Sequence, residues 1–297
     1  MRAQVTLTPT ESKKLIGLAL AHMPEIQHAA QHGTVVMHPS SSTFFAATEL
    51  LGERPATDYW VCGVTVPKGT CIEIGTCVGP HSVANADPSK SATTGNPEAF
   101  RFSWVIRDGK LLTGLSLTDL LPEMGPKDVY IKGVNAIDCN RHVGILVGNL
   151  VEGGTIGKVV SRAAKNGFTL VFPVGLEKLI PIPVEEAARE ALKSQYSYST
   201  GISCGLFPCK QGIVVTETDA VRILAGCEAI PIAAGGLGGA EGAITLVLKG
   251  EDDQVKNAIS YVERSKGAQL PQVRTFNCVD CHQPICGFSM AGKSWIV

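Results

Sequence analysis

The sequence has no long hydrophobic run and no excess of charge of either sign. Every apolar stretch among the 297 residues is interrupted by Gly, Pro or a charged residue well before the ~18 residues that a membrane-spanning helix needs. The formal net charge is −1, from 26 Lys and Arg against 27 Asp and Glu, which argues against a surface that coats nucleic acid or adheres to anionic lipid. We therefore expect neither a membrane nor a nucleic-acid partner.

A secretion signal is also missing from the sequence. Residues 1–5 lack the charged start, and no apolar segment with a small-residue cleavage site follows them. We therefore expect a cytoplasmic protein, in which the ten cysteines do not form a disulfide framework. With 44% apolar residues the chain can build a substantial core, and its length favours two domains.

Expected strands alternate with expected helices up to about residue 195. Apolar runs at 34–38, 128–131 and 142–147 are typical of buried strands, and Asp108-Gly109 between two such runs predicts a hairpin turn. The segment Thr8-Pro9-Thr10-Glu11 predicts a helix start with a capping box. This alternation favours an α/β domain of three layers with a largely parallel sheet, which we place at residues 1–195.

The order of expected elements changes after residue 195 to strand, helix, strand, strand, helix, strand. This βαββαβ order is typical of a ferredoxin-like α+β domain, which we place at residues 196–276. Residues 277–297 then form a cysteine-rich tail. The glycine-rich segment 235–242 lies between two expected strands, so it predicts a flexible connection; a nucleotide-binding loop would need a helix after it.

Two polar loops lie between an expected strand and the start of an expected helix. The first is 40–43, with its hydroxyls, and the second is 152–161, where Gly153, Gly154 and Thr155 offer free N–H groups near Lys158. Each loop fits simple helix capping, and each also fits anion binding, because a helix N-terminus combines free N–H groups with a favourable dipole. Both would lie at the carboxyl ends of parallel strands, where open α/β folds bind ligands.

The segment 128–138, DVYIKGVNAID, resembles the strand-and-loop motif of the superfamily of ribose-5-phosphate isomerases, CoA-transferases and sugar-phosphate sensors. Three other segments lie along the chain in the order expected of that superfamily, namely 40–43, 152–157 and 182–185. The resemblance covers most of the expected first domain and implies the same α/β fold. The isomerases also carry a small ferredoxin-like lid, which fits the expected second domain.

The chain departs from the isomerase pattern at the catalytic carboxylates. Lys132 and Asn135 stand where the isomerases have acidic residues, and their proton-abstracting Glu falls near Val159. Isomerisation needs a base that removes a proton next to a carbonyl, so we do not expect ribose-phosphate isomerase activity. The segment is more similar to the sensor domains of sugar-phosphate-responsive repressors, although no helix-turn-helix pattern precedes it in the sequence.

Glu152 is the candidate catalytic residue. The resemblance to CoA-transferases implies a nucleophilic Glu in such a Gly-rich loop, where it would attack a thioester while loop amides stabilise the oxyanion. The alternative is a solvated loop carboxylate.

The tail carries a candidate metal site formed by Cys278, Cys281, His282 and Cys286. Three thiolates at this spacing suit a tetrahedral zinc ion or an iron–sulfur cluster, with His282, Cys204 or Cys209 as the fourth ligand. The alternative is a tail without metal. The Cys-x2-Cys-His pattern also matches haem c attachment, but that chemistry needs export.

These patterns favour a protein that binds a phosphorylated or carboxylated small metabolite between three loops. Lys132 and Lys158 would neutralise the anion, and Asn135 and Asp138 would fix ligand hydroxyls, although Asp138 could instead cap its loop. The hydrogen-bond donors would be Ser41, Ser42, Thr43, Gly153, Gly154 and Thr155. Isomerase or acyl/CoA-transferase chemistry is the class to test if the protein is an enzyme; the alternatives are a metabolite sensor or a microcompartment-like structural protein. We expect a homo-oligomer.

Overall fold

The computed structural model describes residues 1–57, 60–61, 70–72, 103–148, 153–191, 196–200, 203–272 and 275–277. Its helices are α1 (Pro9–His22), α2 (Pro24–His32), α3 (Ser41–Leu51), α5 (Leu117–Glu123), α6 (Gly154–Asn166), α7 (Val184–Glu190), α8 (Glu217–Ala225) and α9 (Asp252–Ser265), with a 3-10 turn η3 (Leu176–Lys178). Its strands are β1 (Arg2–Leu7), β2 (Val35–Met37), β3 (Thr70–Ile72), β4 (Trp104–Arg107), β5 (Lys110–Leu112), β6 (Val129–Ile131), β7 (Ala136–Ile137), β8 (Val143–Val147), β9 (Thr169–Pro173), β10 (Gly205–Cys209), β11 (Ile213–Val215), β12 (Glu228–Ala234), β13 (Ile244–Lys249) and β14 (Thr275–Asn277).

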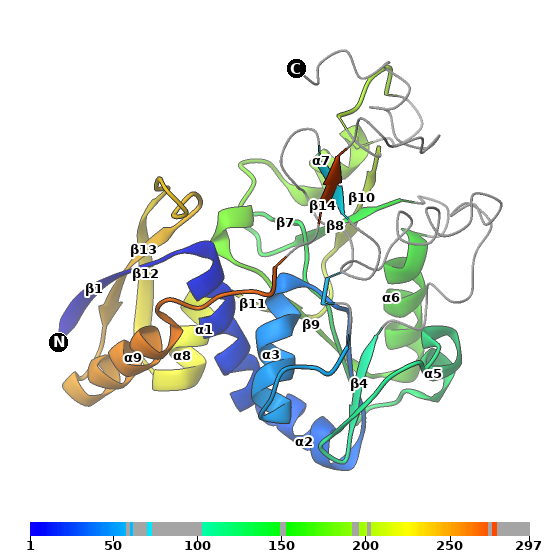
Figure 1. Ribbon diagram of the computed structural model, residues 1–297, viewed down its shortest axis with the longest axis horizontal. Coiled ribbons are helices and arrows are strands. Elements are labelled where there is room, and N and C mark those ends of the chain that lie inside the picture. The colour runs from blue at the N-terminus through cyan, green and yellow to red at the C-terminus, as the bar shows by residue number, and fades with distance from the viewer. Residues whose placement is uncertain are drawn as a thin grey trace.

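A six-stranded, mostly parallel sheet forms the centre of the fold, in the order β11-β9-β6-β2-β4-β5. Strands β11, β9, β6 and β2 are parallel, whereas β4 and β5 add an antiparallel hairpin at one edge. Successive side chains of a strand point to opposite faces, so Val35 and Met37 pack with α1, α3 and α8, while Val36 packs with α5 and α6. The expected three-layer α/β arrangement is therefore confirmed (Figure 1).

The second half of the chain differs from the ferredoxin-like domain expected for residues 196–276. In the described part of that segment, β11 joins the six-stranded sheet, and β10 pairs with β8 in a small antiparallel sheet that also contains β7. Strands β12 and β13 form a third sheet, whose other edge is β1 from the start of the chain. The elements from β11 to β14 follow the expected βαββαβ order, but β10 precedes them and was not expected, and the order of elements does not fix which strands pair. The domain boundaries stay a prediction.

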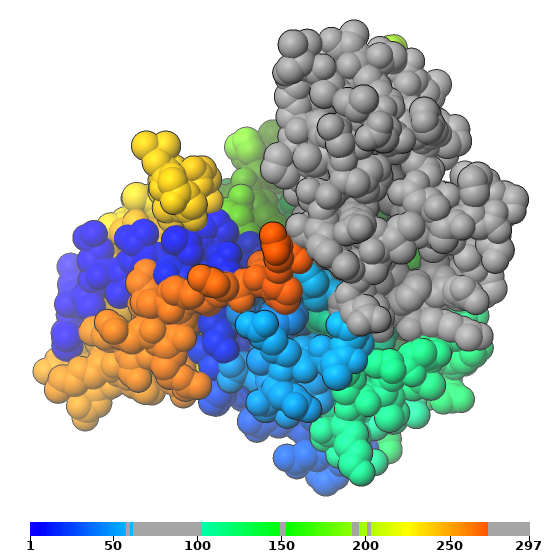
Figure 2. Space-filling view, in the orientation of Figure 1, coloured from blue at the N-terminus to red at the C-terminus, as the bar shows by residue number. Residues whose placement is uncertain are grey.

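The first strand, β1, pairs with a strand far along the chain. Residues Arg2 to Leu7 pair antiparallel with β13, and the terminal amino group of Met1 lies 3.2 Å from the Asp252 carboxylate in α9. In Figure 2 the blue N-terminal residues lie beside the orange residues of α9.

Several local signals are confirmed by the structure. Thr8 caps α1 with the full capping box, and α1 ends just before Pro24, which opens α2. Asp108 and Gly109 both have positive φ, 48° and 68°, as the tight turn between β4 and β5 requires. The segment 235–242 connects the antiparallel strands β12 and β13, as expected.

Within the described residues, no helix combines the length and the apolar character needed to cross a bilayer.

Candidate functional site

The four parallel strands end together at one edge of the central sheet. Met37 is in register with Ile131 and Val215 with Pro173, so the residues that follow β2, β6, β9 and β11 all emerge on the same side. We call this region the carboxyl edge and define it as residues 38–43, 132–134, 175–178 and 216–217. Ligands of open α/β folds bind in this position.

The start of α3 contributes hydroxyl groups to the carboxyl edge. Ser40 caps the helix by accepting a hydrogen bond from the Thr43 N–H at 3.2 Å, and the Thr43 hydroxyl donates to the His38 carbonyl at 2.7 Å. Ser42 is different, because it is 1% exposed and its hydroxyl has no hydrogen-bond partner among the described residues. Helix capping therefore accounts for Ser40 and Thr43 but not for Ser42.

The turn after β6 lies directly against this helix start. A Cβ atom at Gly133 would lie 2.7 Å from the Ser40 Oγ and 3.7 Å from the Ser42 Cβ, so a larger residue would force the two loops apart. Burial of the His38 ring, together with the charge of Lys132, lowers the pKa of His38 well below its usual range. His38 is therefore neutral at pH 7, and Lys132 supplies positive charge beside the α3 start.

A cluster of buried charges forms the other half of the carboxyl edge. The Lys13 ammonium in α1 lies 2.9 Å from the Glu177 carboxylate, and the two side chains are only 10% and 13% exposed. The Lys178 ammonium donates to the Val134 carbonyl at 2.8 Å, and burial lowers the pKa of this lysine. The hydrogen bond of Lys178 joins the charge cluster to the turn that carries Lys132 and Gly133.

Glu217 is the most deeply buried carboxyl group of this cluster. It is 1% exposed, opens α8 after β11, and accepts hydrogen bonds from the Leu176 N–H at 3.0 and 3.1 Å. Burial first, and the nearby charge of Glu177 second, raise the pKa of Glu217 to about 7. This carboxyl group can therefore gain or lose a proton near neutral pH.

Sequence reasoning missed Lys13, Glu177, Lys178 and Glu217. The only local signal for any of these residues is a charged side chain at a helix position that faces the core. Lys13, which lies in α1 between the buried residues Ser12 and Leu15, is such a case.

The Asn135 and Asp138 side chains accept hydrogen bonds from backbone N–H groups in and next to the β7–β8 hairpin. The Asn135 Oδ1 accepts a hydrogen bond from the Leu146 N–H at 3.0 Å. Asp138 is buried and accepts from the N–H groups of Asn140, His142 and Val184 at 2.8, 3.0 and 2.9 Å. For Asp138 these contacts match the loop-capping alternative, and a role for either residue in ligand binding stays a prediction.

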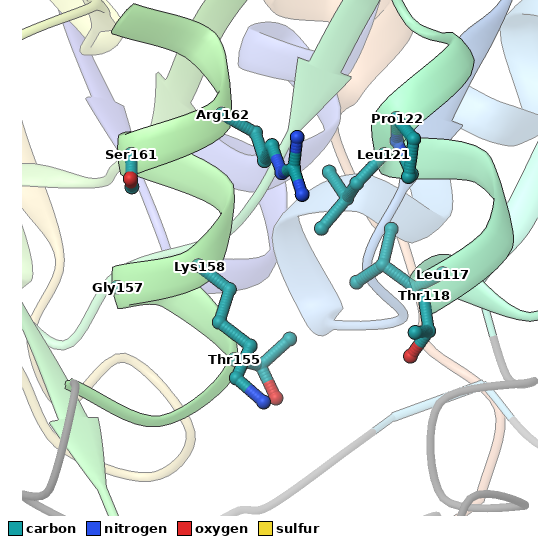
Figure 3. A pocket seen from close by; sticks show the side chains of 9 residues that line it. All are labelled: Leu117, Thr118, Leu121, Pro122, Thr155, Gly157, Lys158, Ser161 and Arg162. Carbon is teal, nitrogen blue, oxygen red and sulfur yellow. The ribbon is translucent and has the colours of Figure 1, made fainter. Parts of the chain in front are cut away.

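Thr155 and Lys158 lie in a separate cavity between α5 and α6. Its volume is about 360 Å³, and Arg162 lines it together with both residues and the apolar side chains of Leu117 and Leu121 (Figure 3). This cavity shares no residue with the carboxyl edge.

The glycines at the start of α6 are held in place by close packing. Gly153 precedes α6 with φ 69°, and a Cβ atom there would lie 2.4 Å from the Phe207 ring. Gly154 opens the helix, also with positive φ. The structure thus brings loop 40–43 together with residues 132–133, while loop 153–158 borders its own cavity, and the roles of Gly153, Gly154, Thr155 and Lys158 in binding stay predictions. Glu152 lies outside the described residues.

The tail cysteines Cys278, Cys281 and Cys286, and His282 with them, also lie outside the described residues. The two cysteines expected as outside ligands are both described: Cys204 is half-buried and Cys209 is buried. The Cys209 thiol donates to the Gln211 carbonyl at 3.3 Å, and burial raises its pKa. The zinc or iron–sulfur site stays a prediction.

No family model matches this chain, and no curated protein matches it. Among solved structures, ribose 5-phosphate isomerase from Plasmodium falciparum is similar over 89% of this chain and 90% of its own, with 13% sequence identity and a TM-score of 0.25. An overlap of this size establishes neither a shared fold nor a shared activity.

Proposed function

We propose that the chain binds a phosphorylated or carboxylated small metabolite at the carboxyl edge. The observation that carries this proposal is the buried Ser42 hydroxyl, which lacks a hydrogen-bond partner in the described structure at the very start of a helix. A buried polar group left unpaired costs about 1–3 kcal/mol. An anionic oxygen placed there would accept the missing hydrogen bond and recover that cost.

Three further features of the edge favour an anion. The first N–H groups of a helix have no intrahelical acceptor, and the helix dipole attracts negative charge to them. Ser41 and Ser42 supply N–H groups of this kind, since α3 begins at Ser41. The Lys132 ammonium adds a full positive charge on the adjoining turn, and Gly133 permits the close approach of the two loops. The class of ligand follows from this chemistry.

The test is the unfolding temperature of the full chain in the presence of sugar phosphates, CoA esters and inorganic phosphate. A ligand present at 100 times its Kd stabilises the folded state by about 2.7 kcal/mol, so we expect a clear rise with at least one class. Lys132→Met should abolish that rise. Lys127→Met is the matched control, because Lys127 is exposed and precedes the same strand at its opposite end.

Gly133→Ala provides a second, purely steric test. The added methyl group would meet the Ser40 side chain and widen the gap between the loops, so ligand stabilisation should fall without any change in charge. The proposal is wrong if neither ligand class raises the unfolding temperature of folded protein. It is equally wrong if the Lys132 and Lys127 variants respond alike.

Proton-transfer chemistry on the bound metabolite is a second candidate function, and Glu217 favours it. A general acid or base works best when its pKa lies near the working pH, and the pKa of Glu217 is raised to about 7. An isomerase-type reaction would exchange a carbon-bound proton of a sugar phosphate with solvent. Incubation in D₂O followed by NMR would detect that exchange, and Glu217→Gln should abolish it. Exchange at the same rate in both proteins would exclude Glu217 as the base.

A further inference from the structure

A second group of polar side chains converges where the β7–β8 turn meets the start of α7. Asp138 and His142 lie on the turn between β7 and β8, and Glu185 lies in the first turn of α7. The Asp138 and Glu185 carboxylates and the His142 ring each offer one atom, and these three atoms all lie within 4.8 Å of one another. The His142 Nδ1 is 3.0 Å from the Glu185 Oε1 and 3.8 Å from the Asp138 Oδ2.

The backbone holds this group in place through Asp138. One carboxylate oxygen accepts from the His142 N–H and the other from the Val184 N–H, so Asp138 fixes both the turn that carries His142 and the residue next to Glu185. Arg141, which has φ 64°, clamps the same turn by donating to the Asp219 carboxylate at 2.7 Å. Hydrogen bonds that orient the ligands in this manner are typical of metal sites in proteins.

The His142 ring is the least explained member of the group. Its Nδ1 atom is shielded from solvent and makes no hydrogen bond in the described structure, although two carboxylates face it. Neutral imidazole binds a metal ion through the lone pair of a ring nitrogen, and the His142 Nδ1 is the nitrogen that faces both carboxylates.

We propose that Asp138, His142 and Glu185 bind a divalent transition-metal ion, with Zn²⁺ as the preferred ion. Zinc bonds of about 2.0–2.2 Å to nitrogen and oxygen place tetrahedral ligand atoms roughly 3.3 Å apart. The two distances from the His142 Nδ1, 3.0 and 3.8 Å, lie on either side of that value. One imidazole with two carboxylates is a ligand set that suits zinc, and three protein ligands leave a fourth position open to water or a substrate atom.

Lys210 forms an ion pair with one carboxylate of the proposed metal site. Its ammonium lies 2.6 Å from the Glu185 Oε1, and its side chain is 62% exposed. Because the lysine can move into solvent, its ammonium and the metal ion compete for the same carboxylate. This competition distinguishes a metal site from a simple network of ion pairs, since removal of Lys210 would weaken the network but strengthen the site.

The test uses the full chain with Cys278, Cys281 and Cys286 replaced by Ser, so that the tail cannot bind the added ion. After treatment with a chelator, calorimetric titration with Zn²⁺ should give one site per chain. Glu185→Gln and His142→Ala should each weaken binding at least tenfold. Glu186→Gln, at the exposed neighbouring position, should leave it unchanged, and Lys210→Met should tighten it.

Co²⁺ gives an independent spectroscopic readout of the ligand set. In the Cys→Ser protein, bound Co²⁺ should show visible bands without the near-ultraviolet charge-transfer band of thiolate ligands. The proposal is overturned if the Cys→Ser protein is folded yet binds no Zn²⁺, or if Glu185→Gln binds as tightly as its parent. Weaker binding by Lys210→Met would likewise leave only an ion-pair network. None of these results bears on anion binding at the carboxyl edge.

Discussion

The two ends of the parallel strands differ in how completely their buried polar groups are hydrogen-bonded. At the amino end, the buried Asp128 accepts from the N–H groups of Thr34 and Gly125, both at 2.7 Å, and Arg107 donates to the Thr34 hydroxyl at 2.8 Å. At the carboxyl end, the Ser42 hydroxyl and one Glu177 oxygen are buried without a hydrogen-bond partner in the described part of the chain.

The difference lies in how completely the buried polar groups are paired. A buried polar atom that is fully paired contributes to stability, whereas an unpaired one costs free energy. The carboxyl edge therefore carries a cost that the amino end does not, and local costs of this kind concentrate at functional sites. We therefore expect removal of a paired group to destabilise the fold at either end, and removal of an unpaired group to cost little or to stabilise it.

The largest expected effect is at the amino end. Asp128→Ala would leave the N–H groups of Thr34 and Gly125 without their acceptor, and we expect a loss of about 4 kcal/mol in the free energy of unfolding, from about 1–3 kcal/mol per buried donor. Urea unfolding measures this loss. Asp128→Asn retains one acceptor oxygen and should lose less. If Asp128→Ala loses less stability than Asp128→Asn, the Asp128 carboxylate does not stabilise the fold by accepting these two hydrogen bonds.

The next effect concerns the buried ion pair at the carboxyl edge. Lys13→Met would leave Glu177 as an uncompensated charge in a largely buried position, and we expect a loss of about 3 kcal/mol. The double variant Lys13→Met, Glu177→Met should recover most of it, because no charge is then left behind. If urea unfolding gives the same stability for the single and double variants, the loss in Lys13→Met does not come from an unpaired Glu177 charge.

Glu217 should produce a smaller effect with an unusual dependence on pH. Its pKa is about 7 in the folded state against an ordinary value near 4.3 in the unfolded chain. The folded state therefore binds more protons between these values, so this group's contribution to stability falls as the pH rises through that range and is fully lost above about 7.

Glu217→Gln removes this titration while keeping an oxygen that can accept from the Leu176 N–H. We expect the variant to be more stable than the parent by about 2 kcal/mol at pH 8 and nearly equal to it at pH 4.5. Unfolding curves at the two pH values measure the difference. A constant difference between variant and parent would show that Glu217 is ionised at both.

The smallest expected effect is at Ser42. Ser42→Ala deletes a hydroxyl that is buried and unpaired in the described structure, so stability without ligand should stay within about 1 kcal/mol of the parent or rise slightly. Stabilisation by the anionic ligand should nevertheless fall. A clear loss of stability without ligand would mean that the hydroxyl is paired in solution and belongs to the fold.

Features that depend on neighbours in the sequence could be predicted, and those that depend on distant partners could not. The capping box at Thr8, the turn at Asp108-Gly109 and the polar loop with Ser42 all follow from residues a few positions apart. Strand β1 was missed because Arg2–Leu7 becomes a strand only by pairing with β13. Glu177 and Glu217 were missed for the same reason, since only the folded chain brings them to Lys13 and Leu176.

The pairing of β1 with β13 has a consequence for synthesis on the ribosome. Arg2 pairs with Lys249, and at elongation rates of about 5–20 residues per second the partner residue is made roughly 12–50 s after Arg2 itself. During that interval β1 is a free strand edge, of the kind that invites pairing with other chains. Completion of the third sheet is therefore a late event in the synthesis of the chain.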